Sequence, residues 1–198
     1  MAVKDLDARI RALLAAGQVC EATTLAVREL GPEILGFLSG VLGNDDGDEA
    51  FSRLSVRLWR SLKGFEGRCA LRTWTYVLAR QEIGRFRRDV RKHIDGRVSI
   101  TELEEVLADV RSRTRSTLAA ERRRMFKKLR DELPIEDRTL LILRVDSNLR
   151  WDEIALAFAA DPEVFSDEDR KREAARLRKR FQLVKDRLAA RAREGSAG

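Results

Sequence analysis

Apolar residues recur at intervals of three and four along most segments of this chain, and that spacing places them on one face of an α-helix. The clearest example is the stripe formed by Leu177, Phe181, Val184 and Leu188. Only three prolines interrupt 198 residues, and the chain is rich in Ala, Leu, Arg and Glu, which favour helix. The sequence therefore predicts an all-α protein.

Breaks in this periodicity divide the chain into two small helical domains. The pattern weakens between Asp95 and Leu118, so we predict a first domain over residues 1–95, a mobile linker over residues 96–118 and a second domain over residues 119–198. The helices expected in the first domain are 3–16, 19–30, 32–42, 48–62 and 71–91, with a break at Gly31-Pro32 and a turn at residues 43–47. Those expected in the second are 119–133, 137–145, 151–158 and 166–193, the last starting from a capping residue, Ser166.

The net charge and the absence of several motifs limit the classes of function that this chain can have. The formal net charge is +7 and the isoelectric point is near 9.9, which suits a polyanionic partner such as nucleic acid. No apolar run is long enough for a signal peptide or a membrane span, and Cys20 and Cys69 form no CxxC pair, so a reducing cytoplasm fits best. His93 is the only histidine, and no phosphate-binding loop occurs. We therefore expect no catalysis, no metal, no cofactor and no small-molecule substrate.

The second domain ends in a strongly basic helix. From residue 169 to residue 193 the chain has eleven Lys or Arg and three Asp or Glu. On a helical wheel Lys179 lies almost opposite the apolar stripe, and Arg172, Arg176 and Gln182 lie within about a quarter turn of it. Two short helices followed by a long basic helix are typical of a helix-turn-helix DNA-binding domain. A merely solvated surface helix and a membrane-surface helix are the alternatives.

Four sequence blocks, in this order, resemble the extracytoplasmic-function (group 4) sigma factors of bacterial RNA polymerase. They are DDGDEAFSRLSVRLWRSLKGF, LRTWTYVLARQEIGRFRRD, LPIEDRTLLILRVDSNLRWDEIALAF and LRKRFQLVKDRL. The resemblance covers most of the chain, from about Glu29 to Leu188. It implies an alternative sigma factor, without enzymatic activity, that binds core RNA polymerase, recognises the minus-ten and minus-thirty-five promoter elements and promotes transcription initiation.

The resemblance also implies a role for each domain. The first, of sigma region 2 type, docks on the polymerase clamp through the helix 48–62. Its polymerase-binding candidates are Asp48, Glu49, Ser52, Arg53, Val56, Arg57 and Arg60. Phe51, Leu54 and Leu58 are expected to be buried beneath them. The same domain reads and helps to melt the minus-ten element with the loop 65–70 and the helix that follows. The minus-ten candidates are Arg72, Trp74, Tyr76, Arg80, Gln81, Arg85, Arg87 and Arg88. Trp74 can instead pack in the core, which is the commoner role for a tryptophan.

The second domain, of sigma region 4 type, is expected to read the minus-thirty-five element and to meet the polymerase flap. Its DNA-binding candidates are Arg172, Arg176, Arg178, Lys179, Arg180, Gln182 and Lys185. Arg176 and Lys179 are expected to meet base edges, and Arg178, Arg180 and Lys185 to hold phosphates. Besides polymerase and promoter DNA, the resemblance allows an anti-sigma factor as a partner.

The chain departs from the family pattern in four places. Ser52-Arg53 stands where the family has Gln and an acidic residue, Gln81 replaces the usual Asn, Arg150 replaces a small capping residue, and the loop from Ala159 to Asp169 is long. The first departure favours an alternative, a helix-turn-helix regulator that binds DNA without polymerase. A nucleic-acid enzyme would need carboxylates that hold Mg²⁺, and the acidic residues at 45–49 are better explained by the start of a helix.

Overall fold

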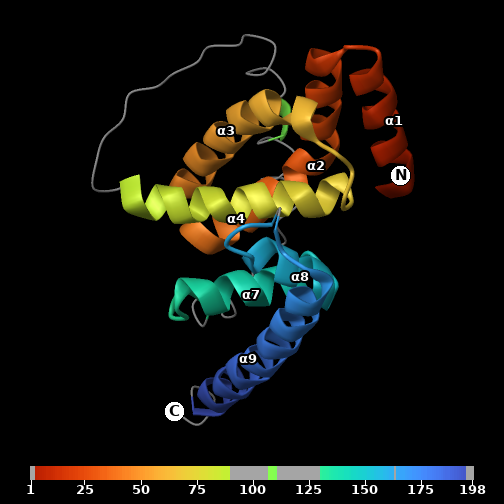
Figure 1. Cartoon of the computed structure of the whole chain (residues 1–198). Helices are drawn as coiled ribbons and strands as arrows, with labels where there is room; N and C mark the ends of the chain where they lie inside the picture. Colours follow the sequence, from red (N-terminus) through yellow and green to blue (C-terminus); the bar gives the residue numbers. More distant parts are fainter. Residues whose placement is uncertain (1–2, 90–106, 111–129, 163, 195–198) are drawn as a thin grey trace. The chain divides into compact units, whose positions relative to one another are not determined.

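The computed structural model describes residues 3–89, 107–110, 130–162 and 164–194. Every regular element in these residues is helical, which confirms the predicted all-α class (Figure 1). The chain divides into two compact units, Met1–Thr117 and Leu118–Gly198. His93, the linker apart from residues 107–110 and the predicted helix 119–133 up to residue 129 lie outside the described residues.

The first unit is built around one long helix. This helix, α2 (Val19–Leu42), contacts α1 (Val3–Ala15), α3 (Asn44–Ser61) and α4 (Leu71–Asp89), and a short 3-10 helix, η1 (Leu62–Gly64), follows α3. Each of the four helices sends fully buried side chains into a shared core, among them Ile10, Phe37, Leu54 and Leu71. This shared core fixes which faces of α3 and α4 point outward.

The predicted break at Gly31-Pro32 is wrong, because α2 continues through it with Pro32 inside the helix. An internal proline removes one backbone hydrogen bond and costs about 3 kcal/mol. The buried residues on both sides of it, Leu30, Ile34 and Leu35, nevertheless belong to one continuous apolar face. Burying each such side chain contributes about 1.5–3 kcal/mol, so core packing outweighs the local cost.

The predicted turn at residues 43–47 is also shorter than expected. α3 begins at Asn44 instead of residue 48, and the N–H of Gly47 already donates to the carbonyl of Gly43 at 2.9 Å. Asp45 and Asp46 therefore lie in the first turn of α3, where carboxylates stabilise the positive end of the helix dipole. The acidic cluster thus has the structural role expected of it.

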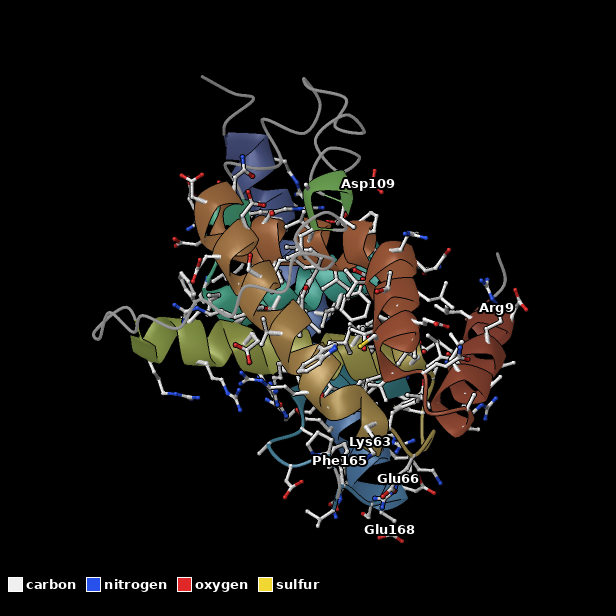
Figure 2. The ribbon with its side chains drawn as sticks, turned by 90° about the horizontal axis from the view of Figure 1, so that it is seen from above. Arg9, Lys63, Glu66, Asp109, Phe165 and Glu168 are labelled. Carbon is white, nitrogen blue, oxygen red and sulfur yellow. The ribbon has the colours of Figure 1, made fainter. Side chains whose placement is uncertain are left out.

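A short helical turn at residues 107–110 lies within the stretch predicted as linker, and it belongs to the first unit. Leu107 and Val110 are buried, whereas Asp109 is exposed on the outer side of the turn, as Figure 2 shows. A Cβ placed on Gly31 would lie only 2.9 Å from Val110 Cγ2 and 3.2 Å from Phe51 Cζ. Because Gly31 has no side chain, Val110 can pack against α2 at this position.

Within residues 130–162 and 164–194, the second unit has two short helices and one long one. They are α7 (Ile135–Val145), α8 (Trp151–Phe158) and α9 (Asp167–Glu194), and α9 contacts both of the others. Val184 packs with Leu133 and Leu141, and the half-buried Phe181 and Leu188 lie against this cluster. Leu177 is fully buried. The apolar stripe predicted for the last helix is therefore confirmed as its inward face.

The start of α9 is capped as the sequence predicts. The hydroxyl of Ser166 accepts the N–H of Asp169 at 3.1 Å and donates to the Asp169 carboxylate at 2.6 Å. The Ser166 hydroxyl is the main reason why the pKa of Asp169 is lowered, and Arg172 adds to the effect. At α8 the carboxylate of Glu153 accepts the N–H of Arg150 at 2.8 Å, so this helix start also has a side-chain partner despite the missing small residue.

Candidate nucleic-acid interface

The outward face of α3 carries the residues predicted to bind polymerase. Phe51, Leu54 and Leu58 are buried as expected, while Glu49 and Arg60 are exposed and Asp48, Ser52 and Val56 are half-buried. Arg53 pairs with Glu49 at 2.9 Å, and its guanidinium lies 5.4 Å from the ring centroid of Phe86 in α4. Arg53 is therefore engaged on the protein surface, and Arg60 is the more accessible cation of this face.

A buried carboxylate, Glu82 in α4, joins α3 to α4. Its side chain is 6% exposed and accepts hydrogen bonds from Arg57 at 3.1 Å and from Arg85 at 3.0 Å. Arg57 also donates to the side chain of Gln81. Burial and then the charge of Arg85 lower the pKa of Arg57, whereas Glu82 opposes that change. Arg57 and Gln81 thus hold the two helices together, which leaves them poorly placed to reach a partner.

The start of α4 contains a second network around Glu33 of α2. Arg72 donates twice to the Glu33 carboxylate, and the hydroxyl of Tyr76 donates to it at 2.8 Å. Tyr76 is fully buried and meets Phe37 edge to face, with ring centroids 5.3 Å apart. This geometry contradicts the expectation that Tyr76 touches DNA, because its ring is in the core and its hydroxyl already has an acceptor.

The accessible DNA-binding candidates of α4 lie near its C-terminal end. The exposed residues Arg85, Arg87 and Arg88 give this end of the helix a positively charged surface, whereas Arg80 is half-buried. Lysine or arginine side chains arranged in this way can follow the phosphates of a nucleic-acid strand. The second half of α4 is therefore the basic surface of this unit.

An aromatic pair joins the loop before α4 to the first turn of α4. The rings of Phe65 and Trp74 lie 5.1 Å apart at a tilt of 43°, and both side chains are half-buried. Figure 2 shows Lys63 and Glu66 at the outer edge of this connection, and Glu66 pairs with Arg68 at 2.6 Å. Trp74 packs on Phe65 of the loop, and neither aromatic side chain is fully buried.

In the second unit, one buried carboxylate holds part of the basic helix. Asp137 of α7, whose side chain is 6% exposed, accepts Arg180 Nε at 2.6 Å and lies 3.5 Å from Arg187 Nη1. Trp151 of α8 has the guanidinium groups of Arg144 and Arg178 over its ring at 5.2 and 5.6 Å from the centroid. Arg180 and Arg178, both predicted to hold phosphates, are therefore anchored to α7 and α8.

The other candidates lie on the outward face of α9. Arg172 pairs with Asp169 at 2.7 Å, Arg176 with Glu173 at 2.6 Å, and Gln182 donates to Asp186 at 3.1 Å. Hydrogen bonding to Glu173 raises the pKa of Arg176. These residues are exposed, and exposed pairs one turn apart are worth only about 0.2–1 kcal/mol. Such pairs can be exchanged for contacts with nucleic acid, and the exposed Lys179 and Lys185 lie on the same helix.

Sequence reasoning missed three acidic residues that organise these surfaces, namely Glu33, Glu82 and Asp137. A signal for each exists, since each lies three or four residues from buried apolar positions of its own helix. Within the described residues, no group of three or more His, Cys, Asp or Glu is placed to hold a metal ion. No helix in the described part of the chain combines the length and the apolar character needed to cross a membrane.

The fold and these surfaces define an all-helical protein with basic helices in both units. Residues 26–93 match the family model of Sigma-70 region 2, a span that contains most of α2 and all of α3 and α4. Over these residues the chain is similar to Sigma-70 region 2, and the match covers less than half of its length. No curated protein and no solved structure matches the chain significantly. α1 and the second unit lie outside the matched residues.

Proposed function

We propose that this chain is an alternative sigma factor of the extracytoplasmic-function type, which directs core RNA polymerase to a set of promoters. The match of residues 26–93 to Sigma-70 region 2 carries the proposal. The exposed cations in both units add support, because promoter binding needs positive charge along DNA phosphates. No enzymatic activity and no cofactor form part of the proposal.

The polymerase clamp binds the outward face of α3. Glu49, Val56 and Arg60 supply the contacts, with Asp48 and Ser52 at the edge of the surface. Arg53 and Arg57 act mainly by fixing α3 to α4, through Phe86 and Glu82. This division keeps the docking face in a fixed relation to the basic part of α4.

The minus-ten element binds along α4 and the loop before it. Arg85, Arg87 and Arg88 hold phosphates, and Arg80 is a further cation on the same helix. The Phe65–Trp74 pair offers a flat, partly exposed surface to a base that leaves the duplex, since stacking on an aromatic ring stabilises an unpaired base by about 1–3 kcal/mol. Arg72, Tyr76 and Gln81 support this surface from within the unit.

The second unit acts as a helix-turn-helix domain of sigma region 4 type. α9 enters the major groove of the minus-thirty-five element, and the unit also meets the polymerase flap. Arg176 and Lys179 meet base edges, with Arg172 and Gln182 beside them. Lys185, Arg178 and Arg180 hold phosphates, and the last two do so from positions fixed by Trp151 and Asp137.

The decisive experiment combines gel filtration with core RNA polymerase and run-off transcription from a genomic promoter library. We expect the chain to co-elute with the polymerase and to yield transcripts from a subset of promoters that core polymerase alone does not use. A chain that binds DNA but neither co-elutes nor supports transcription would be the helix-turn-helix regulator that Ser52-Arg53 favours.

One charge reversal tests the docking face. Arg60→Glu should weaken binding to core polymerase by roughly tenfold or more, because a reversed charge in an interface repels its partner. Arg28→Glu, at an exposed position of α2, is the matched control and should keep wild-type affinity. Equal affinity of the two variants would exclude Arg60 from the interface.

A further inference from the structure

Helix α1 lies outside the residues that match Sigma-70 region 2, yet it lies beside the loop and makes a hydrogen bond to the helix proposed to bind the minus-ten element. Asp7 of α1 accepts the backbone N–H of Leu71 through Oδ1 at 3.1 Å. Leu71 is the first residue of α4, and it is fully buried. A backbone N–H in the first turn of a helix has no partner within that helix, so a buried one needs an acceptor from elsewhere.

α1 is held firmly enough to supply that acceptor. Leu6 and Ile10, which stand on either side of Asp7, are buried at 5% and 0% exposure against the core of the unit. Burying two side chains of this size contributes several kcal/mol, by the usual figure of about 1.5–3 kcal/mol for each. The Asp7 carboxylate is therefore presented from a fixed element.

A second residue of α1 lies beside the loop. Arg11 is one helical turn after Asp7, so the two side chains share a face of α1. A Cβ placed on Gly67 would lie 3.9 Å from Arg11 Nη1, which brings Arg11 next to the middle of the loop. Gly67 has a φ of +72°, a conformation that glycine adopts without strain and that gives the loop its bend.

Contacts hold the loop at both of its ends, and Arg11 lies beside its middle. Phe65 packs on Trp74 at one end, Arg11 lies beside Gly67 in the middle, and Asp7 binds the N–H of Leu71 at the other end. The contact at the end next to α4 comes from α1, and so does the neighbouring Arg11. The Asp7 carboxylate also lies at the positive end of the α4 dipole, where a negative charge stabilises the helix start.

We propose that α1 is part of the promoter-opening surface, with Asp7 as a positioning residue that caps α4 and fixes the loop 65–70. This inference rests on the proposed function, since it assigns a purpose to the loop that only a promoter-melting protein has. Asp7 does not touch DNA in this account. It acts by keeping Phe65, Trp74 and the backbone between them in one conformation.

Three variants test the cap in the full-length protein. Asp7→Ala removes the acceptor, Asp7→Asn keeps an acceptor oxygen without the charge, and Asp5→Ala changes an exposed carboxylate in the first turn of the same helix. In hydrogen exchange by mass spectrometry, peptides covering residues 66–74 should exchange roughly tenfold faster in Asp7→Ala than in the wild type, as expected for the loss of a charge-assisted hydrogen bond. The exchange rate of Asp7→Asn should lie between those of Asp7→Ala and the wild type, and the rate of Asp5→Ala should equal that of the wild type.

The functional consequence is measured on promoter opening. A promoter selected by run-off transcription carries 2-aminopurine in its minus-ten element, and the fluorescence rise reports base unstacking after mixing with the polymerase complex. Asp7→Ala should slow opening roughly tenfold at unchanged affinity for core polymerase, with partial recovery in Asp7→Asn. A merely structural role would lower polymerase affinity and opening together.

The possible results distinguish the cap on α4 from its role in promoter opening. Unchanged exchange in Asp7→Ala would overturn the cap, and faster exchange with wild-type opening would overturn the positioning role. If even the wild type gave no transcripts, the proposed function would fail and the role in opening with it, while the exchange measurement would still decide whether Asp7 caps α4.

Discussion

Two glycines in α2 offer a sharp test of the packing of the 107–110 turn. Replacing glycine by alanine inside a helix normally stabilises it by about 0.5–1 kcal/mol. At Gly36 a Cβ meets nothing within 4 Å, so Gly36→Ala should show the full gain. At Gly31 the same methyl group would approach Val110 Cγ2 to 2.9 Å, Val110 Cγ1 to 3.1 Å and Phe51 Cζ to 3.2 Å.

The expected sign therefore differs between the two sites. Forcing a methyl group into a filled space costs about 1–3 kcal/mol. Subtracting the intrinsic gain of alanine leaves a net loss of stability of up to about 2.5 kcal/mol for Gly31→Ala. If the 107–110 turn detaches instead of straining, the unit loses the burial of Leu107 and Val110, and the sign is the same.

The assay is urea unfolding followed by tryptophan fluorescence in a Trp151→Phe background, in which the remaining tryptophans report only the first unit. A double-mutant cycle with Val110→Ala identifies the partner. Gly31→Ala should cost less in the Val110→Ala background, by about 0.5 kcal/mol or more, because the closest contacts are gone. Limited proteolysis should also cut near residues 107–110 earlier in Gly31→Ala. A Gly31→Ala protein as stable as Gly36→Ala, with the same protease resistance, would refute the packing of Val110 on α2.

Further predictions concern the second unit. Lys179→Ala should change which minus-thirty-five sequences are preferred in a binding-selection assay, because a base contact is worth about 1–3 kcal/mol of discrimination. Lys185→Ala should lower affinity for all sequences alike and reduce the slope of log affinity against log salt by about 1, measured by fluorescence anisotropy. Equal behaviour of the two variants would mean that the outward face of α9 is assigned wrongly. Asp137→Asn should lower the stability of the second unit by about 1–2 kcal/mol in urea unfolding, a figure that allows for the partial exposure of Arg180 and Arg187. An unchanged midpoint would show that these ion pairs do not stabilise the fold.

Helical periodicity predicted the fold well wherever apolar residues decide the structure. It located the buried stripe of α9, the inward face of α3 and both short helices of the second unit. It failed at Gly31-Pro32, because the local preference of proline for a helix start does not include the apolar surface that α2 buries on both sides of Pro32. It also placed Val110 in a linker, since the glycine that receives its side chain is far away in the sequence.

The candidate site was predicted less completely, and the reason is long-range pairing. A wheel identifies which side of a helix a residue lies on, but it does not show which acid from another helix will meet it. The resemblance to sigma factors assigns Tyr76 and Arg72 to DNA, but both side chains bind the carboxylate of Glu33 in α2, which the helical wheel of α4 does not show. Arg57 is likewise a candidate for binding polymerase, but its guanidinium is held by the carboxylate of Glu82 in α4.

The contact between Asp137 and the basic helix has a consequence for the proposed binding of α9 to DNA. A free arginine side chain samples many rotamers, and ordering it on a phosphate costs roughly 0.5–1.5 kcal/mol. Arg180 is already ordered by Asp137, so that conformational entropy is lost when the unit folds and not when DNA binds. If Arg180 holds a phosphate as proposed, folding stability and DNA affinity depend on the same side chain. A variant that removes the Asp137 carboxylate should then weaken both, although Asp137 is buried.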